Sequence, residues 1–161
     1  MPRTGNKTPL SSDEIVEQHF PLYGPYDRDT TVRAGFTMAE LTRYLNYATA
    51  EADGLPFPVA LYDLIGALNV VAQRLPQALE QSGQRLGQLA ELPEFVNRSM
   101  DYLAEPETAH ANAVEVAAQA RAELQRAAGL ARGLADQLAT VQTVISPLGM
   151  NIAFDDDEDE D

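Results

Sequence analysis

The sequence contains no cysteine and no tryptophan, and only two of its 161 residues are histidine. The lack of cysteine excludes disulfides, thiolate zinc sites, iron–sulfur clusters and cysteine nucleophiles. No apolar run approaches the ~20 residues of a membrane-spanning helix. Residues 1–12 lack the apolar stretch of a signal peptide. We therefore expect a cytoplasmic protein that does not enter a membrane.

Positive charge is also scarce. The chain has 11 Lys and Arg against 25 Asp and Glu, a net charge of −14, and its last seven residues are all acidic. An acidic surface repels DNA, RNA and anionic lipid, which argues against direct nucleic-acid binding. The length fits one domain. The predicted organisation is a flexible lead-in over residues 1–10, a helical bundle domain over 11–152 and a disordered acidic tail over 153–161.

Apolar residues recur at helical spacing and no segment alternates like a strand, which predicts an all-α fold. Ser11 and Glu14 have the spacing of a capping box, so a short helix should begin beside them. Asp29 or Thr30 is expected to cap the next helix. The pattern predicts helices over residues 13–20, 31–52, 59–91, 94–104 and 108–145.

The two longest predicted helices carry heptad-like seams. Pro76 lies inside residues 59–91, so this helix is expected to kink or to break there. Its seam is predicted at Leu61, Leu64, Leu68, Val71 and Leu75. The seam of residues 108–145 alternates spacings of four and three, and its Leu-rich half should hold the structure. Its positions are Ala113, Ala117, Ala120, Leu124, Ala127, Ala131, Leu134, Leu138, Val141 and Ile145. We expect these two helices to form an antiparallel hairpin with residues 31–52 packed across it.

No catalytic pattern emerges. His19 and His110 are the only histidines, and both are interpreted as surface or capping residues rather than as members of a triad. No cofactor or metal motif is present, so we expect neither.

Exposed apolar side chains are the remaining candidates for a site. Phe20, Tyr23 and Tyr26 lie in a turn-rich connector, where they either cover the bundle end or form part of a partner-binding face. The apolar face of the last helix is wider than one neighbour needs, because Val114, Val116 and Leu130 flank its seam. These six residues are the candidate partner-binding residues.

The segment FPLYGPYDRDTTVRA, followed by AELTRYLNYAT, spans most of residues 20–49. It resembles small helical proteins of unknown function from actinobacteria. The resemblance implies a bacterial, cytoplasmic protein and transfers no site.

These observations favour a non-enzymatic helical protein for protein–protein interaction or scaffolding. Its partner would be another protein or a second copy in a homodimer. The alternative is an acidic decoy that mimics DNA and occupies a nucleic-acid-binding protein.

Overall fold

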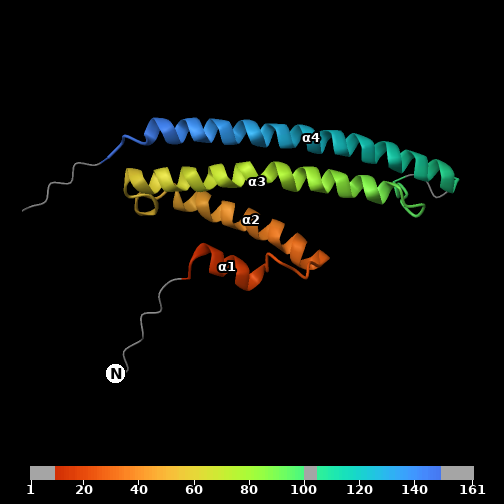
Figure 1. The fold of residues 1–161 in the computed structure, drawn as a ribbon, viewed down its shortest axis with the longest axis horizontal. Helices are drawn as coiled ribbons and strands as arrows, with labels where there is room; N and C mark the ends of the chain where they lie inside the picture. Colours follow the sequence, from red (N-terminus) through yellow and green to blue (C-terminus); the bar gives the residue numbers. More distant parts are fainter. Residues whose placement is uncertain (1–9, 100–104, 150–161) are drawn as a thin grey trace, which may run out of the picture. The chain divides into compact units, whose positions relative to one another are not determined.

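The computed structural model describes residues 10–99 and 105–149, and within them all regular structure is helical (Figure 1). This confirms the all-α class. The predicted tail and most of the predicted lead-in lie outside the described residues. The helices are α1 (Ser12–His19), α2 (Arg28–Ala48), the short 3₁₀ helix η1 (Ala52–Gly54), α3 (Pro58–Ala90) and the long α4 (Pro106–Ile145).

The chain divides into two compact units, Met1–Leu55 and Pro56–Asp161. The first contains α1, α2 and η1, and the second contains α3 and α4. The predicted single domain over residues 11–152 stays a prediction, and each unit is described by itself.

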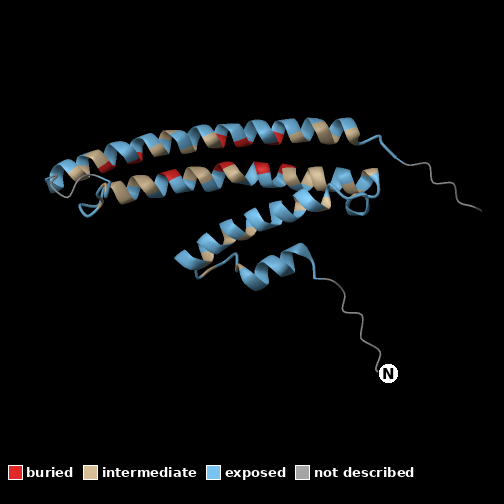
Figure 2. Ribbon diagram, turned by 180° about the vertical axis from the view of Figure 1, so that it is seen from behind, coloured by how far each residue is buried: buried red, intermediate tan, exposed pale blue. Residues whose placement is uncertain are grey.

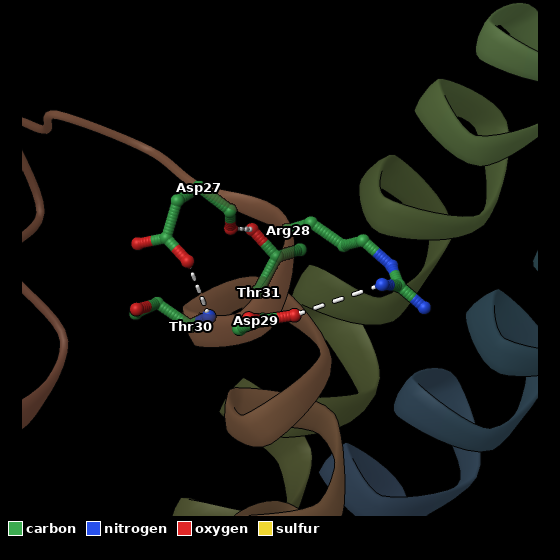
Figure 3. A network of polar contacts seen from close by, with 5 residues as sticks. All are labelled: Asp27, Arg28, Asp29, Thr30 and Thr31. Carbon is green, nitrogen blue, oxygen red and sulfur yellow. Dashed lines mark hydrogen bonds and ion pairs between the residues drawn. The ribbon is translucent and has the colours of Figure 1, made fainter.

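Side-chain caps begin the first two helices. The Ser11 hydroxyl accepts the Glu14 N–H at 3.2 Å and the Glu14 carboxylate accepts the Ser11 N–H at 2.8 Å, so the predicted capping box is confirmed. The predicted start of the second helix is wrong. α2 begins at Arg28, three residues before the expected start, because the Asp27 carboxylate accepts the Thr30 N–H at 2.8 Å and caps the helix (Figure 3). The helix also ends earlier, at Ala48.

α3 continues through Pro76, so a break at that residue is wrong. The proline ring is buried, and this burial compensates for the hydrogen bond that a proline removes from a helix. The helix predicted over residues 94–104 is wrong for its described part. Residues 94–99 form turns, in which the Phe95 N–H donates to the Leu92 carbonyl at 3.0 Å.

α3 and α4 lie side by side and run in opposite directions (Figures 1 and 2). Their register follows from two glycines of α3. A methyl group added to Gly66 would meet the Gln142 side chain, and one added to Gly87 would lie 3.0 Å from the Arg121 guanidinium carbon. An ion pair between Arg132 and Glu80 also joins the helices.

The buried surface between these helices consists of small residues. In α4 the buried positions are all alanines, namely Ala113, Ala117, Ala128, Ala131 and Ala135. In α3 they are Asn69, Ala72, Pro76 and Gly83 (Figure 2). Small side chains let two helix backbones approach closely, and half-buried leucines flank this contact, as Leu124 does opposite Gly83.

Both predicted seams are therefore out of phase in part. Leu134 is 51% exposed, whereas Ala128 is fully buried. Val71 is likewise exposed, and its C-terminal neighbour Ala72 is buried. The Leu-rich half of the last helix does contribute to the contact, through three buried alanines and the half-buried seam residues Leu138, Val141 and Ile145, but its seam residue Leu134 is exposed.

Candidate interaction surfaces

The aromatic connector between α1 and α2 divides into an inner and an outer part. Phe20 is half-buried, and the Arg33 guanidinium lies over its ring at 5.7 Å from the centroid. The Tyr26 hydroxyl donates to the Leu22 carbonyl, which ties this exposed ring to the connector. Tyr23 is 93% exposed. Of the three aromatic residues predicted here, Phe20 is held in place, whereas Tyr23 is free for contact with a partner.

The Asp27 cap fixes how the connector enters α2. Besides accepting the Thr30 N–H, Asp27 accepts a hydrogen bond from the Thr31 hydroxyl through its backbone carbonyl at 2.8 Å (Figure 3). The Thr30 N–H lowers the pKa of the Asp27 carboxyl. A groove of about 290 Å³ beside this cap is lined by Phe20, Tyr26 and Ala34, among others. A largely apolar groove therefore lies beside the cap at the start of α2.

α2 presents exposed aromatic side chains that the sequence reasoning missed. Phe36, Tyr44 and Tyr47, here called the aromatic face, are all exposed, with Phe36 at 70%. They lie near one side of the helix because positions 8 and 11 residues apart are close in angle at 3.6 residues per turn. The half-buried positions of α2 follow a different line, which includes Ala34, Leu45 and Ala48. The spacing of Phe36, Tyr44 and Tyr47 is the sequence signal that indicates this face.

The three candidates predicted on the last helix do not form one patch. Val116 lines a groove of about 330 Å³ together with Leu86, Phe95 and Ala113. Val114 is exposed and is not among the residues that line this groove. Leu130 lies four helical turns further on and is 77% exposed. Leu134, about one turn beyond Leu130, is exposed too.

The histidines occupy two different settings. His19 is exposed in the last turn of α1, as predicted. His110 is half-buried, and its Nδ1 lies 2.8 Å from the Phe95 carbonyl oxygen, so it joins the turn after α3 to α4 rather than lying free on the surface. Beside it, the Asn97 side-chain amide donates to the Asn112 side-chain oxygen at 2.6 Å. These contacts give His110 a structural setting.

Among the described residues, no three His, Asp or Glu side chains converge as a metal site. None of the helices in the described part of the chain has the length and apolar character needed to cross a membrane. No protein-family model, no curated protein and no solved structure matches the sequence.

Proposed function

We propose that the chain is a non-enzymatic helical protein for protein–protein interaction or scaffolding in the bacterial cytoplasm. The aromatic face of α2 is the observation that carries this proposal. Tyrosine and other aromatic side chains are enriched in protein interfaces, where they provide large rigid contact areas. Phe36, Tyr44 and Tyr47 are exposed on one helix, and this is the composition of an interface rather than of a solvated face.

The charges between these rings suit a protein partner. Glu40 forms an ion pair with Arg43 at 2.7 Å, and both side chains are largely exposed. Such a pair is close to self-neutralising and contributes little to stability at a surface. It gives the aromatic face a polar element that orients a partner. The hairpin of α3 and α4, with its side chains of small volume at the helix contact, would serve as the scaffold.

Capture of a partner by the full chain tests this proposal. The wild-type chain should recover a stoichiometric protein from the source cell, and Tyr47→Ala should weaken that recovery strongly. Truncation of a hot-spot tyrosine costs about 2 kcal/mol or more, which corresponds to an affinity loss of roughly 30-fold. Thr42→Ala is the matched control, since Thr42 is exposed on α2 away from the three rings.

Tyr23→Ala distinguishes two locations of the site. Loss of the partner with Tyr23→Ala, but not with Tyr47→Ala, would move the site to the connector. Equal recovery with all three variants would contradict a site on either aromatic surface. Recovery of a nucleic-acid-binding protein that the chain displaces from DNA would instead favour the acidic decoy.

A further inference from the structure

The aromatic face of α2 has a pair of opposite charges at its centre. Glu40 and Arg43 form an ion pair at 2.7 Å between the outer rings of the face. Together with Phe36 and Tyr47 they fall within about 60° of the helix circumference at 3.6 residues per turn. All four side chains are exposed, and the half-buried line through Ala34 lies on the far side of the helix. The four residues therefore form one exposed strip, here called the α2 strip.

The rings and the charges of the α2 strip share one midpoint. The segment from Phe36 to Tyr47 is centred between Leu41 and Thr42, and the segment from Glu40 to Arg43 has the same centre. Read from its N-terminal end, the strip presents an aromatic ring, an acid, a base and an aromatic ring. Read from its C-terminal end, it presents a ring, a base, an acid and a ring. The strip is therefore complementary to a reversed copy of itself in both shape and charge.

From this shared midpoint we infer that the aromatic face binds a second copy of the chain, with α2 antiparallel to the partner's α2. The inference rests on the proposed function and names the protein that the face binds. A two-fold interface must be self-complementary, and the α2 strip meets that requirement. Phe36 of one copy lies at the level of the partner's Tyr47, and Glu40 lies at the level of the partner's Arg43. Aromatic contacts at both ends then enclose the charges at the centre.

The charges select the antiparallel arrangement over the parallel one. In a parallel pair Glu40 would face the partner's Glu40, and like charges placed opposite each other at an interface disfavour the complex. In the antiparallel pair the four charged side chains alternate in sign and add no net charge. The ion pair within each copy does not compete with this contact, because a guanidinium carries several N–H donors and can bind two carboxylates. The charges therefore fix the register, and the rings provide most of the contact area.

The length of the α2 strip sets the strength of this contact. At 1.5 Å per residue the strip spans about 17 Å, so the contact is smaller than the ~800 Å² per partner of a standard interface. Interfaces of this small size belong to transient complexes. We therefore expect a reversible dimer that dissociates at low concentration and forms as the concentration rises.

Mass measurement of the full chain tests the dimer. Light scattering from micromolar to millimolar concentration should show the mass of the wild-type chain rising from 17.5 kDa toward twice that value. Tyr47→Ala should weaken the dimer at least tenfold while leaving the helical circular dichroism signal unchanged. A monomeric wild-type chain at every concentration would overturn the inference, and so would a dimer that Tyr47→Ala leaves unchanged.

Two charge reversals test whether the strip faces its own copy. Glu40→Arg makes both charges of the strip positive, and Arg43→Glu makes both negative. Each variant alone should stay monomeric, because like charges then face each other, and an equimolar mixture of the two should recover the dimer. Glu115→Arg makes the same change of charge at an exposed position of α4 and should leave the dimer intact. A mixture that stays monomeric, or a dimer of either reversed variant alone, would reject the proposed pairing.

Spin labels test the orientation, and the lack of native cysteine allows single labelling sites. Antiparallel pairing predicts that the distance between equivalent labels grows by about 3 Å per residue from the midpoint of the strip. Labels at Ala39→Cys should be about 8 Å apart along the helix axis, and labels at Val32→Cys about 28 Å apart. Equal distances at both sites would mean parallel pairing and reject the proposed axis.

Capture from the source cell separates this inference from the proposed function. The tagged wild-type chain should recover its own untagged copy, and Tyr47→Ala should lose it. Recovery of a different protein that depends on Tyr47, together with a monomeric mass for the chain, would reject the second copy and retain the proposed function. A monomeric mass without any protein that depends on Tyr47 would reject both.

Discussion

Two carboxylates define the starts of the first two helices. Each accepts a backbone N–H that a helix start would otherwise leave without a partner. Donation from the Ser11 N–H lowers the pKa of Glu14, and donation from the Thr30 N–H lowers the pKa of Asp27. Both groups are exposed, so their effect is local: they decide where α1 and α2 begin. Asp27, rather than the predicted Asp29 or Thr30, is the capping residue of α2, so the helix begins at Arg28.

The Asp27 cap predicts a pH dependence. Because the folded pKa is below the ordinary value of 3.8, the cap stabilises the fold above that value and loses this contribution as pH falls through the lowered pKa. Asp27→Asn keeps an acceptor oxygen but does not titrate. The wild-type chain should melt higher than Asp27→Asn at neutral pH, and this difference should shrink as the pH falls below the ordinary pKa of 3.8. A pH-independent difference in melting temperature would contradict the charged cap.

Glycine positions in the first unit predict opposite effects of the same substitution. A Cβ at Gly54 would lie 1.9 Å from the Ala48 carbonyl oxygen, and backbone cannot move aside as a flexible side chain can. A Cβ at Gly35, inside α2, would meet nothing within 4 Å. Gly35→Ala should therefore stabilise by up to ~1 kcal/mol, and Gly54→Ala should destabilise. Thermal melts of both variants check this, and a gain of stability with Gly54→Ala would contradict it.

At the scale of elements, the sequence predicts the existence of the helices better than their phase. Pattern and capping residues locate α1, α3 and α4 to within two residues at their starts. The apolar face of α4 is wide, so several stripes satisfy the same heptad rule. Choosing the stripe with the largest side chains selects Leu134, whereas close approach of the helices selects Ala135. A large side-chain volume favours Leu134 as the position that faces α3, whereas a short distance between the helix backbones favours Ala135. A single sequence does not show the distance between two helix backbones.

The candidate site shows the same division. The sequence identifies exposed Tyr23 and Leu130 because a connector tyrosine and a leucine beside a seam are visible locally. It does not identify the aromatic face of α2, because the sequence does not show which side of this helix is covered, whereas the structure shows the half-buried line through Ala34 and Leu45. The sequence also does not predict the turns at residues 94–99, where a helix was expected. Their backbone groups pair with Leu92 and Ala109, and such pairings leave no periodic signal.

The alanine contact between α3 and α4 predicts sensitivity to added volume. Ala128→Leu forces a larger side chain into a fully buried position and should destabilise by about 1–3 kcal/mol. Ala139→Leu makes the same change at an exposed position of the same helix and should be nearly neutral. Chemical denaturation of both variants gives the comparison. Equal loss of stability would mean that Ala128 does not face α3.

At the scale of the whole molecule, charge is distributed unevenly along the chain. Seven of the 25 acids occupy the last seven residues, so residues 1–154 carry 18 acids against 11 bases, a net −7. The helix contact itself contains small uncharged side chains, and the ion pair of Arg132 with Glu80 lies at its exposed edge. Stability of the hairpin therefore depends on packing, and the excess negative charge opposes the compact state through self-repulsion.

Removal of the acidic run Asp155–Asp161 should consequently leave the melting temperature unchanged or raise it slightly, because it halves the net charge and removes no apolar residue. The rise should be largest near 0.01 M salt, where the Debye length is about 30 Å, and should disappear at 1 M, where it is about 3 Å. Replacing the seven acids with Asn and Gln is the matched control, since it removes the charge at constant length and should reproduce the deletion. A clear fall in melting temperature in both variants would mean that these carboxylates bind the helical body, because neither loss of length nor repulsion explains such a fall.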